Sequence, residues 1–195
     1  MLRTVTLAAA LLMGFAPFQS SIRADEYAVD PSHTSVIFGV SHLGYSFTYG
    51  RFDKVSGAFT LDPAKPDAAS FTLTIDAGSI NTNDAKRDEH LRNADFFNTG
   101  EFPLISFKSE KVAVKEVDGA QVYEVTGQLT MHGVTKPITL NLQKLGEGAG
   151  PTGQDYRTGF NCQTKLSRSE WGMTKMVGPI GDEVAVTISF EGVRK

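Results

Sequence analysis

The sequence predicts an all-β protein made of short antiparallel strands. From Thr34 onward, apolar residues recur at every second position, which is the period of a half-buried strand. Gly, Pro, Asp and Asn separate these runs and indicate turns. We count about eight or nine strands by this criterion. Strands with one apolar face must close into a barrel or stack as a sandwich, because an open sheet would leave that face and two edges exposed.

The first strands show the alternation most clearly. Val36, Phe38, Val40 and His42 share one face of the first long run, and a short strand over 26–30 precedes it. Apolar and polar residues also alternate over 55–61, which ends at an Asp-Pro turn signal, and over 71–75. We therefore expect three neighbouring strands whose apolar sides meet in one interior.

The second half continues the pattern as hairpins. A strand opens after Pro103, and Asp118-Gly119 predicts the reversal of a hairpin that returns over 121–131. A turn near Gly133 leads into a further strand over 138–142. The glycine-rich segment 146–155 predicts a polar, mobile loop before the last two strands, over 156–168 and 184–193.

One segment, NTNDAKRDEHLRNADFF, breaks the period of two and predicts a short helix over 84–92. Thr82 or Asn83 can cap it, and Asp88 with Arg92 would form an ion pair one turn apart on a solvated face. His90 offers a metal or catalytic alternative that the spacing does not favour. The positions three and four residues before it are basic, and the sequence has no nucleophile elbow. We expect no metal site and no catalytic residue.

The N-terminal 24 residues resemble a secretory signal peptide. Arg3 precedes a short apolar run, and Ala24 occupies a plausible cleavage position. The run is shorter than the roughly 20 residues that a membrane-spanning helix needs, so we expect no integral membrane protein. We predict a cleaved signal over 1–24, a single domain over 25–195 and export to the periplasm.

Charge and cysteine content exclude some partners and stabilising devices. Removal of residues 1–24 takes away two arginines and no acids, so the formal charge changes from −3 to −5. An acidic chain without a long basic run argues against a nucleic-acid partner. Cys162 is the only cysteine, so no intramolecular disulfide can form and packing must hold the fold.

Aromatic residues gather in two stretches, 42–52 and 96–107, each with arginines nearby. Core packing and a hydrophobic mouth with a cationic rim both fit this pattern. On the second interpretation, Arg51 and Arg92 form the polar mouth of a ligand tunnel. The residues predicted to line the tunnel are Phe38, Val40, His42, Tyr45, Phe47, Tyr49, Phe52, Phe59, Phe71, Leu73, Ile75, Phe96, Phe97 and Phe107.

Four stretches together resemble the YceI-like family of exported polyisoprenoid-binding proteins. They are YAVDPSHTSVIFGVSHLGYSFTYGRF, INTNDAKRDEHLRNADFFNTGEFPLISF, VTGQLTMHGVTKPITL, and SRSEWGM with VAVTISFEG, in the family's order and over nearly the whole mature chain. The resemblance implies an extended, lipocalin-like eight-stranded antiparallel barrel that holds a long isoprenoid or similar amphiphile. The resemblance implies that the protein binds or carries a lipid or quinone and requires no cofactor.

These observations lead to one expected function and two alternatives. We expect a periplasmic carrier that holds a polyprenyl or isoprenoid quinone type of lipid, and not an enzyme. The first alternative is a lipid-modifying hydrolase or isomerase that uses His42 or His90. The second is a stress-related interaction module or a quinone donor to a membrane redox partner. A homodimer stays open, because strand edges or a flat barrel wall could support one.

Overall fold

The computed structural model describes residues 24–195, so the predicted signal peptide lies outside the described residues except for Ala24. This part of the chain is mostly strands, with one α-helix, α1 (Ala85–Arg92). The strands are β1 (Asp25–Val29), β2 (Ser35–His42), β3 (Ser46–Phe52), β4 (Val55–Leu61), β5 (Ser70–Asp76), β6 (Ile80–Asn81), β7 (Leu104–Val117), β8 (Ala120–Met131), β9 (Val134–Ala149), β10 (Tyr156–Ser167) and β11 (Ile180–Arg194). The 3₁₀ turns are η1 (Pro31–His33), η2 (Pro66–Ala68), η3 (Ala77–Ser79) and η4 (Arg168–Trp171).

Eight of these strands close into an antiparallel barrel. The order is β1-β4-β5-β7-β8-β9-β10-β11, and β1 returns to pair with β11. Tyr27 on β1 marks the closure, because it lies opposite Phe59 on one side and Arg194 on the other. Closure removes the sheet edges that the alternating pattern would otherwise expose. The predicted eight-stranded antiparallel barrel is therefore confirmed.

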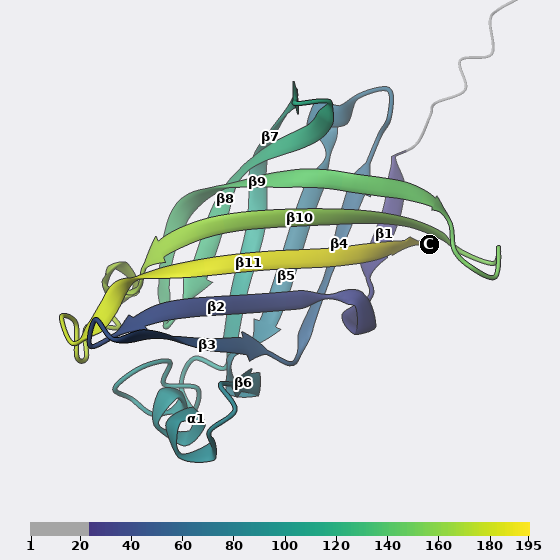
Figure 1. The fold of residues 1–195 in the computed structure, drawn as a ribbon. Helices are drawn as coiled ribbons and strands as arrows, with labels where there is room; N and C mark the ends of the chain where they lie inside the picture. Colours follow the sequence, from purple (N-terminus) through teal and green to yellow (C-terminus); the bar gives the residue numbers. More distant parts are fainter. Residues whose placement is uncertain (1–23) are drawn as a thin grey trace, which may run out of the picture.

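Strands β2, β3 and β6 are additions to the barrel. The first half of β11 pairs with β2, while its end pairs with β1. β3 pairs with β2 along its whole length, but β6 covers only Arg51 and Phe52 on its other side. The β2–β3 turn and the β10–β11 connection lie at the same end of the molecule, at the left in Figure 1, and α1 lies below β3. These additions extend the wall beside one end of the barrel.

An aromatic cluster fills part of the barrel interior. Tyr27 stacks on Phe59 with ring centroids 4.8 Å apart, and Phe59 stacks on Phe71 at 5.6 Å. Phe160 and Phe190 stack at 5.3 Å and meet Phe59 edge-on. All five side chains are almost fully buried. Interlocked aromatic rings make this the packed part of the core.

The predicted helix is confirmed, but its polar contacts differ from the prediction. Asp84 is the N-cap and accepts a hydrogen bond from the backbone N–H of Arg87 at 2.9 Å. Asp88 is buried and accepts from the Thr82 backbone N–H at 2.8 Å, in place of the predicted ion pair with Arg92. A short acidic side chain one turn into the helix can reach the orphan N–H groups that precede it. The helix is therefore anchored to the segment that follows β6 instead of being self-paired in solvent.

Two further observations complete the fold. Strand β9 runs through Ala149, so the predicted loop 146–155 is wrong in its first half, and a turn remains only between β9 and β10. Edge residues of a long hairpin can pair even when their side chains have little to bury, because the ladder bonds are backbone bonds. Among the described residues, no helix has the length and apolar character that crossing a membrane requires.

Candidate ligand cavity

A cavity of about 180 Å³ lies inside the barrel, beside the aromatic cluster. Its surface is almost entirely carbon, contributed by inward-facing side chains from β2 to β5 and from β7 to β11. Voids with apolar walls stay dry, because water would lose its hydrogen bonds there. The lining residues include Val36, Phe38, Val40, Phe52, Val55, Leu73, Ile75, Ile105, Phe107, Leu129, Met131, Ile138, Leu140, Thr164, Leu166, Val184, Val186 and Ile188.

The alternating pattern of the sequence produces this lining directly. Phe38 and Val40 on β2 face inward, and their register partners on β11 are Val186 and Val184. Gly50 on β3 leaves the space that the ring of Phe38 occupies. A Cβ added to Gly50 would lie 2.3 Å from Cζ of Phe38, so only glycine leaves room for that ring. The phenyl group can therefore lie flat across β3 at the cavity wall.

The first cap of the cavity comes from α1 and the loop that follows it. Leu91, Phe96 and Phe97 contribute to the lining. Phe97 meets Phe52 of β3 edge-on with ring centroids 5.7 Å apart, and Phe96 packs against the ring of His90 at 5.0 Å. The two phenylalanines that follow the helix thus close part of the mouth with apolar surface.

The second cap is the connection between β10 and β11, and Arg168 organises it. The buried guanidinium donates to the carbonyl oxygens of Met173 at 2.6 Å, Lys175 at 2.8 Å, Gly181 at 2.9 Å and Ile180 at 3.2 Å. Desolvation by burial lowers the pKa of Arg168. Because its donors are directed at backbone carbonyls, the cation holds the loop in shape while Met173 and Ile180 contribute apolar surface to the cavity.

One carboxylate joins the two caps. Asp95, in the loop after α1, lies 3.3 Å from Nε2 of His90 and 3.4 Å from Nζ of Lys175 in the β10–β11 connection. The hydrogen bond with His90 and then the contact with Lys175 lower the pKa of the Asp95 carboxyl. The pair spans the mouth, so separation of the caps would require this ion pair to break.

The predicted tunnel residues divide into two groups in the structure. Those that belong to the cavity lining are Phe38, Val40, Phe52, Leu73, Ile75, Phe96, Phe97 and Phe107. The others are not among the lining residues. Phe59 and Phe71 lie in the aromatic cluster, and His42 ends β2, half-buried beside the mouth. Ligand contact by any of these residues stays a prediction.

Tyr45, Phe47 and Tyr49 are exposed on the outside of the molecule instead of lining the tunnel. Phe47 and Tyr49 lie out of phase with Phe52, so alternation along β3 directs their side chains away from the interior. The role of Arg51 and Arg92 as a polar mouth stays a prediction. Arg51 shares this outward phase and pairs with Asp53 at 2.7 Å, while Arg92 reaches the carbonyls of Gly78 and Ile80. Both guanidinium groups therefore have at least one partner within the protein.

The residues that sequence reasoning missed are Arg168 and its loop. The only sequence signal for them is the SRSEWGM stretch, which resembles the YceI-like family but does not indicate a role for its arginine or its tryptophan. Trp171 is fully buried and donates from Nε1 to the carbonyl of Leu129 at 3.3 Å. His132 reaches the backbone carbonyl of Trp171 at 2.8 Å. The tryptophan thus fixes η4 to the β8–β9 hairpin and sets the position of Arg168.

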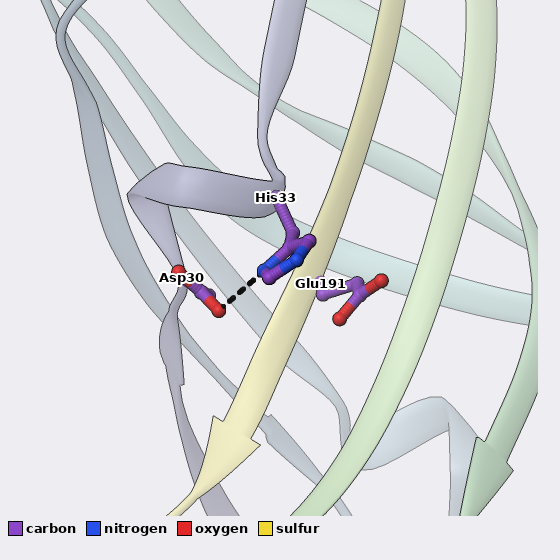
Figure 2. A group of neighbouring side chains, drawn as sticks. All are labelled: Asp30, His33 and Glu191. Atoms are coloured by element: carbon purple, nitrogen blue, oxygen red, sulfur yellow. Dashed lines mark hydrogen bonds and ion pairs between the residues drawn. The ribbon is translucent and has the colours of Figure 1, made fainter. Parts of the chain in front are cut away.

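A cluster of possible metal ligands lies away from the cavity. Asp30, His33 and Glu191 place one ligand atom each within 4.8 Å of one another, from the η1 turn and from β11 (Figure 2). The guanidinium of Arg157 already contacts this group, at 2.7 Å from Asp30 and 3.0 Å from Glu191. A cation bound there would compete with this arginine. Hydrogen bonds from Ser32, then His33, then Arg157 lower the pKa of the Asp30 carboxyl. The group is best described as an ion-pair network.

Comparisons with known proteins agree with this architecture. The family model described as YceI-like domain matches residues 27–192. A UPF0312 protein of Azotobacter vinelandii is 40% identical over 190 residues, which cover 96% of this chain and 97% of the relative. BcnA of Burkholderia cenocepacia shares the fold with a TM-score of 0.70 and 25% identity, over 84% of this chain and 98% of BcnA.

A further solved structure shows the fold at greater distance. A polyisoprenoid binding domain from Saccharophagus degradans superposes with a TM-score of 0.66 and 20% identity, over 87% of this chain and 98% of that domain. At this identity the likeness supports the fold alone. The family match over nearly all described residues, the relatives and the barrel together show that this chain belongs to the YceI-like family.

Proposed function

We propose that this protein is a carrier that holds the hydrocarbon chain of an isoprenoid lipid inside the barrel. The observation that carries the proposal is the interior cavity with an almost purely carbon surface. Such a surface offers nothing to orient a reacting polar group, but it suits a chain without polar atoms. The polyisoprenoid binding domain named above directs the choice of lipid class towards isoprenoids.

Burial of hydrocarbon supplies enough free energy for tight binding without polar recognition. Each buried CH₂ contributes about 0.8 kcal/mol, so two or three isoprene units can outweigh the entropic cost of association. The ligand's polar head would remain at or outside the mouth, since Arg168 gives its donors to backbone carbonyls. Chain length and branching, and not head-group chemistry, would then determine affinity.

We further propose that the protein binds its ligand without chemical change and works in the periplasm. Neither His42 nor His90, the candidates for lipid chemistry, belongs to the cavity lining. His90 contacts Phe96 and Asp95 and so contributes to the cap. The signal-like N-terminus supports export. Incubation of the protein with a bound lipid, followed by mass spectrometry of the extract, would detect any chemical turnover of the lipid. Observed turnover would contradict a pure carrier role.

A chain-length series tests the carrier proposal. Tritiated geraniol, farnesol, geranylgeraniol and solanesol share one head group and differ only in the number of isoprene units. We expect affinity to increase with each added unit until the chain fills the interior, and then to level off. A flat series, or equal binding of short polar alcohols, would contradict hydrophobic burial as the source of affinity.

A further inference from the structure

Exposed apolar side chains gather at one end of the molecule. Tyr45 and Phe47 of the β2–β3 hairpin keep 88% and 61% of their surface exposed, and Leu43 and Tyr49 are also exposed. Met176, in the β10–β11 connection, is exposed as well. Isolated exposed apolar residues are ordinary, but a contiguous group of them marks an interaction site.

Backbone contacts show that the two segments form one surface. The Leu43 backbone N–H donates to the carbonyl of Pro179 at 2.7 Å, and His42 pairs with Ile180 in the register of β2 and β11. The Tyr49 ring lies against the outer side of β2 at Gly39, where an added Cβ would lie 2.8 Å from the tyrosine ring. We call Leu43, Tyr45, Phe47, Tyr49, Met176 and Val177 the tip patch.

The tip patch lies next to residues that line the cavity. The same β10–β11 connection that carries Met176 also contributes Met173 and Ile180 to the cavity lining. Lys175, in that connection, contacts Asp95 of the other cap. Figure 1 shows this connection beside the β2–β3 turn at one end of the barrel, while the β9–β10 turn lies at the opposite end. A body that covers the tip patch therefore lies against the β10–β11 connection, which forms the second cap of the cavity.

We propose that the tip patch docks the cavity mouth on the surface of a lipid bilayer. This proposal rests on the proposed function. A hydrocarbon chain that binds inside the barrel must first leave a membrane, and contact between the protein and the bilayer shields the chain from water during the transfer. Tyrosine favours the membrane interface, where its ring lies in apolar surroundings and its hydroxyl group reaches water, and phenylalanine adds apolar surface that can enter the bilayer. A protruding hairpin tip can enter a fluid interface.

Flotation with vesicles of phosphatidylethanolamine and phosphatidylglycerol tests the docking. The purified, processed protein is compared with Tyr45→Ser/Phe47→Ser and with Leu145→Ser. Leu145 is 63% exposed on β9, near the opposite end, and so matches Phe47 in exposure. We expect the double variant to lose vesicle partitioning by about tenfold or more, because two apolar side chains no longer enter the interface. Leu145→Ser should partition like the unmodified protein.

Two controls separate the docking from the carrier function and from self-association. Both variants should bind geranylgeraniol added from ethanol as the unmodified protein does, because the substituted side chains lie outside the cavity. Geranylgeraniol binding without vesicle binding would overturn the docking and leave the carrier function standing. Failure of all three proteins to bind geranylgeraniol would instead overturn the carrier function. A dimer in light scattering that Tyr45→Ser/Phe47→Ser dissociates would assign the patch to a second copy and overturn the proposal.

Discussion

Filling the cavity should abolish ligand binding without unfolding the protein. Thr164 lies on β10 among the lining residues, and Gln163, its neighbour, faces outward and is exposed. Thr164→Trp places an indole in the interior, whereas Gln163→Trp places the same group in solvent. The two variants therefore differ only in the face of one strand.

The magnitude follows from the carbon atoms displaced. An indole in a cavity of about 180 Å³ excludes on the order of one isoprene unit of the guest. Five carbons at about 0.8 kcal/mol each amount to roughly 4 kcal/mol, or about a thousandfold loss of affinity. Filling a true void should leave the free energy of unfolding nearly unchanged, whereas an indole forced into a packed core would cost about 1 to 3 kcal/mol.

The assay measures tritiated geranylgeraniol retained by the protein in size-exclusion chromatography, together with unfolding in urea. We expect Thr164→Trp to lose binding and retain its stability, and Gln163→Trp to retain both. Wild-type affinity in Thr164→Trp would refute the cavity as the binding site. Destabilisation by about 1 kcal/mol or more would refute the cavity as an open space, because that is the cost of forcing an indole into a packed core.

Three further predictions concern the caps and the core. Asp95→Asn should weaken the contact with Lys175 and speed ligand release in a stopped-flow exchange assay, while the remote, exposed Glu116→Gln should not. Equal release rates would contradict a role of the Asp95–Lys175 contact in holding the two caps together. Arg168→Met should lower the free energy of unfolding in urea by about 3 kcal/mol or more, since buried carbonyls lose their donors; a loss below about 1 kcal/mol would argue against this role. Burial raises the pKa of Tyr27 to about 12, so the folded state keeps a proton that the unfolded state releases near pH 10.0, and stability should fall between these pH values by about 2 to 3 kcal/mol. Tyr27→Phe should lack that part of the decline in urea unfolding measured across this pH range, and an unchanged slope would contradict the assignment.

The fold could be predicted because alternation and turn residues are local signals. The period of two places Phe38 and Val40 on one face, and Asp118-Gly119 marks a hairpin that the structure contains. Closure of the barrel depends on β1 meeting both β4 and β11, and only the family resemblance indicated it. Alternation indicates that a strand is half-buried, but it does not indicate which neighbouring strand pairs with it to complete the barrel wall.

The site could be predicted only in part, because aromatic content does not distinguish the two faces of a strand. Phe52 and Phe47 belong to one aromatic stretch, yet their odd separation along β3 sends one inward and the other to the surface. Arg168 escaped prediction for a different reason. Its partners are backbone carbonyls of a loop, and side-chain spacing carries no record of such contacts.

The central claim is that an isoprenoid chain occupies the barrel, and the molecules that co-purify with the protein test it most directly. Native mass spectrometry of protein isolated from its own cells, followed by organic extraction, would measure the mass of any guest. We expect one hydrocarbon-chain lipid built from isoprene units for each barrel, lost in Thr164→Trp and kept in Gln163→Trp. A polar guest, or a crystal structure of the ligand-free protein in which side chains fill the interior, would contradict the claim.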